Sequence, residues 1–440
     1  MAANKNTVYF LLVPLGVYCL LLPFEELLSF GKQEEAATLV RYIGMMVGLL
    51  FVLNLLTMRT PFRLGPAQVW AILFIGFGCL SYWWSIAPAA TLQRMPTSLS
   101  LLCFYLAIGL FRTDQKGIDL LGKMIVIGGA AAACAIIYTY HVIGLSFMES
   151  HRASIIYGAK AMNPNDLAFS LLLPLSLLLS QLGRKGSFWA WAVRWWALVT
   201  IAYAGLITGS RGGMLGMAVI ICLFALHKGA KRMRAWAGAL IIIATLVILS
   251  SDVLLQRATL QNESIEYTRG NIWRTGLTAL PDYWLLGAGM DAYPIIYLKH
   301  SNQQRSAAGS HSTYIGTLVE LGVVGLFFLA VAMLLHYRAL RVAHQQSETA
   351  FALKAVFLGM LTMATVYDIL YLKTFWMVLA LTMILSAGAV RLRARGAYIS
   401  GAFTRIPPRI TAGGFGQPPA TDPLRTAGNL QGSADMFKRT

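Results

Sequence analysis

Long apolar runs separated by short polar segments dominate the chain. Runs long enough to cross a hydrocarbon core of roughly 30 Å lie near residues 8–30, 38–57, 67–86, 96–111, 118–145, 165–182, 188–209, 212–227, 235–251, 312–336, 350–371 and 374–390. In lipid, a helix satisfies its backbone hydrogen bonds internally. The pattern therefore predicts an all-α, polytopic integral membrane protein with about 12 transmembrane helices.

The composition supports a bilayer as the solvent of this chain. Of its 440 residues, 57% are hydrophobic and only 12% are charged, which is more apolar surface than one soluble core can bury. The net charge of +18 would indicate a nucleic-acid partner on a soluble protein. Here many of the cations lie in connections between apolar runs, so we expect membrane lipids and no nucleic acid as partners.

Basic residues occupy every second short connection. They are Arg59 with Arg63, Arg112 with Lys116, Arg184 with Lys185, the cluster Lys228, Lys231, Arg232 and Arg234, and Arg338 with Arg341. The positive-inside rule places these connections in the cytoplasm, and an even number of spans then places both termini there as well. The long segment 252–311 is consequently expected to face outward.

Three regions follow from this arrangement. Residues 1–390 form a membrane domain that includes the outward loop 252–311, and residues 391–440 form a basic tail. The tail is rich in glycine, proline and arginine, so we expect it to be disordered, cytoplasmic and close to anionic headgroups. Within the loop, residues 271–280 predict a short amphipathic helix along the membrane interface. Its apolar side carries Ile272, Trp273, Leu277 and Leu280.

The outward side carries several arginines that could bind an anion. Arg211 lies in the break Thr208–Gly213, whose small residues let backbone approach a ligand, and its guanidinium suits phosphate oxygens. The alternative is a tight turn whose arginine snorkels to the interface. Arg269 and Arg274 lie at the start of the predicted interfacial helix, where anions are favoured. The alternative there is a cationic helix on lipid headgroups.

A histidine at a helix entrance is the candidate general base. His311 precedes the tenth apolar run, at a boundary between water and membrane where an imidazole can have a pKa near working pH and accept a proton from a sugar hydroxyl. A capping or surface histidine is the alternative. His300 and His151 have weaker claims, because nothing in their surroundings indicates a pocket.

No outward loop carries an acidic pair such as Asp-x-Asp, which would hold a divalent cation against a diphosphate. We therefore expect no metal and no cofactor, and any diphosphate would be neutralised by arginines.

Four stretches, in order, resemble the O-antigen ligase and polymerase superfamily of bacterial inner-membrane glycosyltransferases. They are Trp84-Ser85-Ile86-Ala87-Pro88 followed by Arg94; Ser210-Arg211-Gly212-Gly213; Arg269 with Trp273, Pro281 and Gly287-Ala288-Gly289; and His311 with Glu320, Gly322 and Gly325. Asn163-Pro164-Asn165 is a further similarity, and Ser312 departs from the asparagine usual in the family. The compact chain is most like the lipopolysaccharide O-antigen ligase branch.

This resemblance implies a GT-C-type glycosyltransferase fold and an active site on the periplasmic face of the inner membrane. The donor would be a glycan on undecaprenyl diphosphate, and the acceptor a sugar hydroxyl of lipid A–core. Arg211 and Arg269, assisted by Arg274, would bind the diphosphate, and His311 would act as general base in an inverting transfer.

Three alternatives remain open at this stage. An O-antigen polymerase would use the same donor class with another acceptor, and a protein O-oligosaccharyltransferase would modify a protein. An anion or lipid-linked-sugar transporter would need charges distributed through the membrane depth. Among the acidic residues in apolar runs, Glu25, Glu26 and Asp368 have no assigned role.

Overall fold

The structure, a computed structural model, describes residues 5–25, 27–30, 37–57, 64–111, 113–148, 151–158, 160–227, 269–301, 308–345 and 347–403. Residues 1–393 form one compact unit and residues 394–440 another. Glu26, the predicted span 235–251, the basic cluster at 228–234, the first part of the outward loop and the tail beyond 403 lie outside the described residues.

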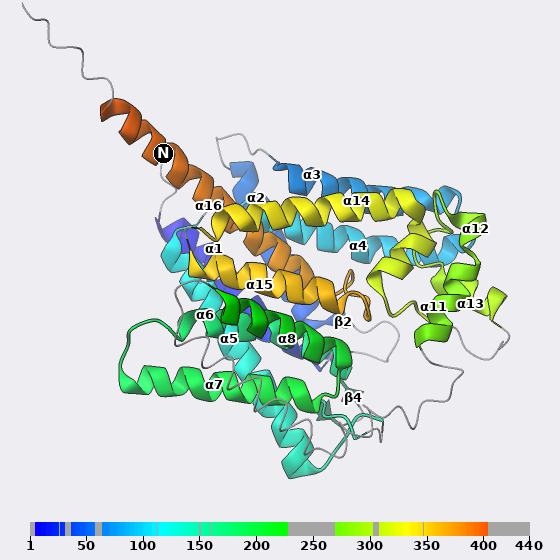
Figure 1. Cartoon of the computed structure of the whole chain (residues 1–440), viewed down its shortest axis with the longest axis horizontal. Coiled ribbons are helices and arrows are strands. Elements are labelled where there is room, and N and C mark those ends of the chain that lie inside the picture. The colour runs from blue at the N-terminus through cyan, green and yellow to red at the C-terminus, as the bar shows by residue number, and fades with distance from the viewer. Residues whose placement is uncertain are drawn as a thin grey trace, which may run out of the picture. The chain divides into compact units, whose positions relative to one another are not determined.

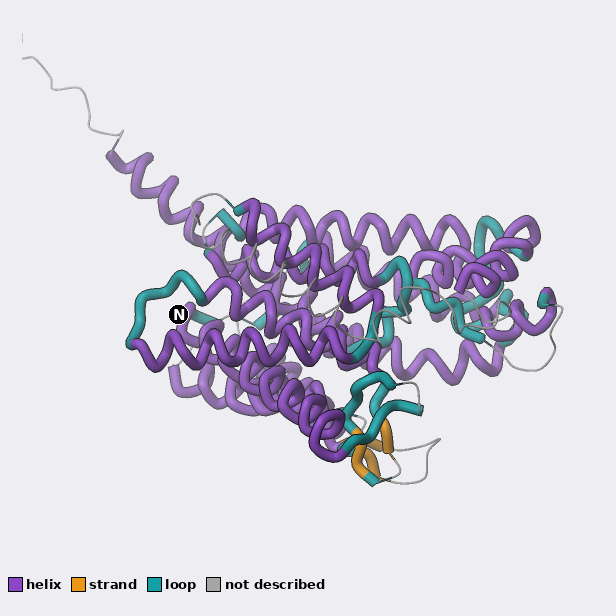
Figure 2. The backbone as a smooth tube through the Cα atoms, turned by 60° about the horizontal axis from the view of Figure 1, so that its bottom comes forward, coloured by secondary structure: helices purple, strands orange, loops and turns teal. Residues whose placement is uncertain are grey.

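Helices account for the architecture of residues 1–393 (Figures 1 and 2). The longer ones are α1 (Lys5–Leu21), α2 (Leu39–Thr57), α3 (Pro66–Leu80), α4 (Pro88–Gly109), α5 (Gln115–Tyr138), α6 (Pro164–Gln181), α7 (Phe188–Ile207), α8 (Arg211–Leu226), α14 (Thr313–Ala343), α15 (Glu348–Met363) and α16 (Lys373–Phe403). Each apolar run predicted above overlaps one of them, apart from the run 235–251, which lies outside the described residues. Helical backbone in α16 also continues past position 390, where the sequence predicts the tail.

Shorter elements connect the long helices. They are α11 (Arg269–Thr278), α12 (Leu280–Tyr283), α13 (Tyr293–His300), the 3₁₀ turns η1 (Leu22–Phe24) and η2 (Ser81–Trp83), and the π-helical turn η3 (Thr139–Ile143). Strands β1 (Ser29–Phe30) and β2 (Ala37–Thr38) pair antiparallel with Ser29 opposite Thr38. Strands β3 (Ile156–Tyr157) and β4 (Lys160–Ala161) pair in the same way with Ile156 opposite Ala161. These short ladders leave the protein essentially all-α.

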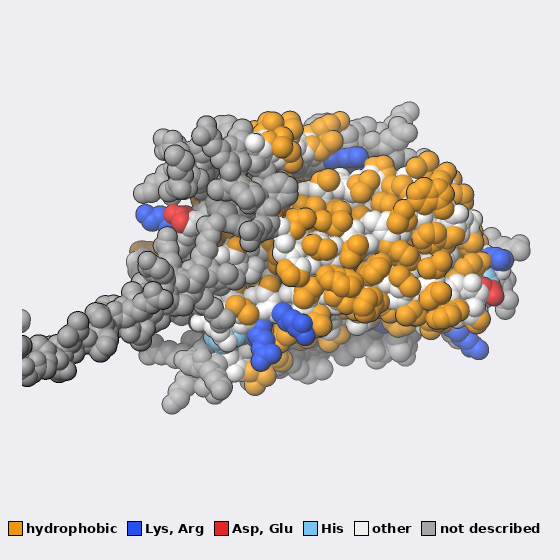
Figure 3. Space-filling view, turned by 90° about the horizontal axis from the view of Figure 1, so that it is seen from above, with side chains coloured by type: hydrophobic (Ala, Val, Ile, Leu, Met, Phe, Trp, Pro, Cys, Tyr) orange, Lys and Arg blue, Asp and Glu red, His pale blue; other side chains and the backbone are white. Residues whose placement is uncertain are grey.

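The helices pack with an apolar interior and an apolar exterior. Helix α15 packs against α6, α8 and α14, and α14 packs along α3. On the outside, Leu73 of α3 is 43% exposed, and Phe327 and Leu334 of α14 are 53% and 48% exposed. Figure 3 shows one broad face covered by such hydrophobic side chains, with lysine and arginine near its margins. A surface of this kind is stable in lipid and not in water.

Four segments are long and apolar enough to cross a membrane by length and composition. They are Pro66–Trp83, Gln115–Ile143, Phe188–Ile207 and Thr313–Ala343. The chain is therefore a helical membrane protein, and the total of about 12 spans stays a prediction.

Helix α14 is broken at Gly322, and a loop is docked on the break. Gly322 has φ 64° and ψ −169°, a conformation open essentially to glycine alone. The loop 284–289 takes up the backbone groups that the break frees. Four hydrogen bonds join them: Val323 N–H to Trp284 C=O (2.8 Å), Val324 N–H to Leu285 C=O (3.3 Å), Ala288 N–H to Val319 C=O (3.0 Å) and Gly289 N–H to Glu320 C=O (2.8 Å).

Gly322→Ala is expected to destabilise the protein by at least about 1–3 kcal/mol, because a β-carbon would meet the Leu285 carbonyl and the backbone would be strained. The measurement is thermal unfolding of the detergent-solubilised chain. Gly76→Ala in α3 is the matched control, since a β-carbon there meets nothing within 4 Å. A Gly322→Ala protein that unfolds at the wild-type temperature would contradict the packing described for this loop.

Candidate active site

Several helix ends gather around the loop 364–372, which joins α15 to α16. Thr313, the first residue of α14, donates its N–H to the Ala364 carbonyl at 2.9 Å. At the start of α8, a β-carbon on Gly212 would lie 2.9 Å from the Val366 side chain, so α8 packs closely on the same loop. The start of α8 carries Arg211, and the start of α14 follows His311. Both helix starts therefore pack on the same loop.

His311 is held in a strained turn. Its φ is 48°, a left-handed conformation that is uncommon for residues other than glycine and that clusters at functional sites. The flanking serines support the turn: the Ser310 hydroxyl donates to the Ser312 carbonyl at 2.9 Å, and the Ser312 side chain caps α14 by accepting from Ile315 N–H. Ser312 thus has a local role as a helix cap. His311 remains partly exposed.

Arg269 acts electrostatically on His311. It is the first described residue of α11, and Trp273 on the same helix donates its indole N–H to the Ser310 carbonyl at 2.9 Å. Partial burial and, after it, the positive charge of Arg269 lower the pKa of His311 from its usual value of 6.5. The imidazole is therefore mostly neutral at pH 7, as a proton acceptor needs to be.

Arg211 begins α8 after a turn that is tightly hydrogen-bonded. Ser210 caps the helix by accepting the Gly213 N–H at 3.2 Å, and Gly209 has φ 61°. Residue Arg152, which the sequence analysis did not identify, braces this turn. Its Nε donates to the Thr208 carbonyl at 2.9 Å. One terminal nitrogen of Arg152 also donates to the Asn165 side chain at 2.8 Å.

The short helix α11 lies where the sequence predicts an interfacial helix. It runs from Arg269 to Thr278 instead of 271 to 280, and it buries Ile272 whereas Leu277 is 42% exposed. Arg274 is exposed on α11. Of the two arginines predicted there, Arg269 contributes to the lowered pKa of His311 and Arg274 does not.

The motif Trp84–Pro88 holds the loop 284–289, which packs against the break in α14. Trp84 donates its indole N–H to the Leu286 carbonyl at 3.2 Å, and Ile86 N–H bonds the Ala288 carbonyl at 2.9 Å. The Gly287-Ala288-Gly289 segment is thus fixed between η2 and the break in α14. These residues position the site and carry no reacting group.

A second group of charged residues lies next to this loop. Arg94 and Asp291 form an ion pair at 2.9 Å, and the Arg94 guanidinium lies over the Tyr371 ring, 4.3 Å from its centroid. Glu320 accepts the Tyr293 N–H at 3.2 Å. Asp291 and Tyr371 had no motif to identify them, although Asp291 lies two residues after the Gly287-Ala288-Gly289 segment.

The structure shows the contacts of two acidic residues to which the sequence assigned no role. Glu25 forms an ion pair with Lys373 at the start of α16. Asp368 accepts the Thr313 hydroxyl at 3.3 Å and the Leu370 N–H at 3.2 Å. Burial raises the pKa of Asp368 above its usual value. In the part of the chain that the structure describes, no group of three His, Cys, Asp or Glu residues could hold a metal ion.

The structure also describes the other two histidines that the sequence analysis considered. His300 ends α13, where its Nδ1 lies 3.1 Å from the Ile296 carbonyl, and His151 has a left-handed backbone with φ 55°.

Comparison with known proteins shows which family the chain resembles. Residues 196–330 match the domain family described as O-antigen ligase. This range includes Arg211, Arg269, Arg274 and His311. The chain is also 24% identical over 346 residues to the exopolysaccharide production protein ExoQ of Rhizobium meliloti (strain 1021), covering 72% of this chain and 74% of that protein. The chain is a helical membrane protein, and it resembles the O-antigen ligase and polymerase superfamily, with the matched domain lying over residues 196–330.

Proposed function

We propose that the chain is an O-antigen ligase of the bacterial inner membrane, with both termini in the cytoplasm and its active site on the periplasmic face. It transfers a preassembled glycan from undecaprenyl diphosphate to a sugar hydroxyl of lipid A–core. The observation that carries this proposal is the electrostatic effect of Arg269 on His311, whose backbone is strained. The loop beside His311 also packs on the start of α8.

In the proposed reaction, His311 takes the proton of the acceptor hydroxyl while the hydroxyl oxygen attacks the anomeric carbon. The bond between that carbon and the phosphate oxygen breaks, and undecaprenyl diphosphate leaves with the electron pair. Arg211 and Arg269, with Arg274 assisting, stabilise its negative charge in the absence of a metal. Direct displacement by one oxygen inverts the anomeric configuration, as in other single-displacement glycosyl transfers. Within a membrane-embedded GT-C-type fold, both lipid chains stay in the bilayer.

The decisive experiment mixes the purified chain with undecaprenyl-diphosphate glycan and lipid A–core in liposomes. We expect a laddered product whose yield is unchanged by EDTA, because guanidinium groups replace the divalent cation. A strict requirement for added magnesium would contradict the arginine mechanism. Movement of donor across vesicles without any acceptor product would instead support a transporter.

A polymerase is the second candidate, and the similarity to an exopolysaccharide production protein favours it. It would join the same donor class to a growing lipid-linked chain. Supplying only lipid-linked repeat units separates the two activities: chain extension without lipid A–core indicates a polymerase, and its absence supports the ligase.

A further inference from the structure

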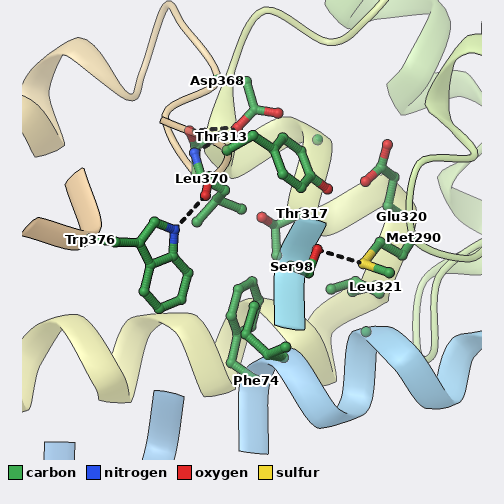
Figure 4. A pocket seen from close by; sticks show the side chains of 14 residues that line it. Phe74, Ser98, Met290, Thr313, Thr317, Glu320, Leu321, Asp368, Leu370 and Trp376 are labelled. Carbon is green, nitrogen blue, oxygen red and sulfur yellow. Dashed lines mark hydrogen bonds between the residues drawn. The ribbon is translucent and has the colours of Figure 1, made fainter. Parts of the chain in front are cut away.

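A narrow pocket adjoins the candidate active site (Figure 4). Its walls come from α3, α4, α14, the loop 284–291, the loop 364–372 and the start of α16. Thr313 belongs to both places: it lines the pocket, and it follows His311 by two residues. Its hydroxyl hydrogen-bonds to Asp368, another residue of the pocket wall. A ligand in this pocket would therefore lie close to the candidate base.

One part of the wall is apolar and rigid. Phe74, Leu370 and Trp376 line it, and Figure 4 shows the Phe74 and Trp376 rings on the same side of the pocket, away from Glu320. The Trp376 indole N–H donates to the Leu370 carbonyl at 2.7 Å, which fixes the orientation of the ring. Fixed aromatic faces provide a large packing area for the apolar side of a ligand.

The other part of the wall offers hydrogen bonds. Thr317 is only 3% exposed, and its hydroxyl oxygen has no hydrogen-bond partner among the described residues. A buried hydroxyl left without a partner is unfavourable, so a ligand group is expected to complete it. The carboxyl groups of Glu320 and Asp368 also line the pocket and can accept hydrogen bonds from ligand hydroxyls.

The pocket offers no positive charge to an anionic ligand. Among the described residues that line it, none is a lysine, an arginine or a histidine. Arg94, which lies near it, is already ion-paired with Asp291 at 2.9 Å. An apolar face and several hydroxyl-binding groups therefore fit a neutral polyol ring better than a phosphorylated one.

We propose that this pocket binds one neutral sugar unit of the acceptor glycan, with Thr317, Glu320 and Asp368 receiving its hydroxyl groups and Phe74 and Trp376 packing on its apolar face. The assignment of this sugar to the acceptor rests on the proposed function. Its position next to Thr313 would bring a neighbouring hydroxyl toward His311.

The test is binding of methyl glycosides of neutral hexoses to the purified full chain, followed by saturation-transfer NMR. Wild type is expected to bind at least one of them and to bind its 6-phosphate at least tenfold more weakly. Thr317→Leu, which fills the pocket with an apolar side chain, is expected to abolish the signal. Ser100→Leu, at an exposed position of α4, is the control and should bind as wild type does.

Equal signals from wild type and Thr317→Leu, or no glycoside bound by wild type, would overturn the pocket assignment. Because this experiment needs neither donor nor transfer, its result is independent of the ligase assay. In the transfer assay, Thr317→Val removes one hydrogen bond and is expected to raise the acceptor KM about five- to tenfold with the donor KM unchanged. An unchanged acceptor KM would count against the proposal.

Discussion

His311→Ala is expected to lower the rate of glycan transfer by about 10²–10⁴-fold, the usual loss when a general base is removed. Donor binding should stay close to wild type, because the diphosphate is assigned to the arginines. The measurement is laddered product formed in liposomes, together with donor binding by the same preparation. Full transfer by a His311→Ala protein of normal abundance would rule out the base assignment.

His300→Ala is the matched control for this experiment. His300 also lies in the segment predicted to face outward, but it ends α13 with its ring against the Ile296 carbonyl, so its loss should leave transfer unchanged.

The pH profile of glycan transfer gives a second measurement of the role of His311. A base accepts a proton only when neutral, and the pKa of His311 is lowered. The activity should therefore be retained as the pH falls through 6.5 and be lost only below it, and His311→Ala should remove this acidic limb.

The positions of the helices were largely predictable from local sequence. Apolar runs of membrane length leave few alternatives, since a lipid-exposed backbone must satisfy its own hydrogen bonds. The start of α14 could also be predicted from the sequence, because a serine such as Ser312 before an apolar run is a typical helix cap. The boundaries of α11 were less accurate: the helix includes Arg269 and Gly270 and ends at Thr278, whereas the prediction runs from 271 to 280.

The pocket beside the site was not predictable, because it depends on contacts between distant segments. Arg94 and Asp291 are separated by 197 positions in the chain and still form an ion pair. The break at Gly322 likewise needs the loop 284–289 to take up its backbone groups. Glycines and single charged residues in an apolar run indicate a break in the helix or a polar contact there. The residues that they contact can be identified only from the three-dimensional structure.

The candidate site and the pocket beside it are joined by a short segment. His311 lies two residues before Thr313, whose hydroxyl hydrogen-bonds to Asp368 in the pocket wall. Arg269 acts electrostatically on His311 from α11. In the proposed mechanism the arginines bind the diphosphate of the donor and the pocket binds an uncharged sugar of the acceptor, so the base lies at the junction of the two substrates.

Arg211→Ala and Arg269→Ala are each expected to cost about 2.7–4 kcal/mol of transition-state stabilisation, or roughly 10²–10³ in kcat/KM. Unlike the loss of His311, both changes should also weaken donor binding, because in the proposed mechanism a guanidinium contacts the diphosphate before and during its departure. Arg211→Lys should recover part of the loss, since it restores the charge without the planar donor fork. Transfer kinetics and donor binding, measured over a range of donor concentrations, check both effects.

Arg338→Ala is the matched control, because Arg338 is exposed near the opposite end of α14 from Thr313. Its loss should change neither donor binding nor kcat/KM. If Arg211→Ala and Arg269→Ala bound the donor as wild type does and lost only kcat, the arginines would act on the leaving group alone, and the proposed ground-state contact with the diphosphate would be wrong. If Arg269→Ala also raised the pKa seen in the acidic limb, the guanidinium would be acting on His311 as the structure places it, since removing a neighbouring positive charge favours the protonated imidazole.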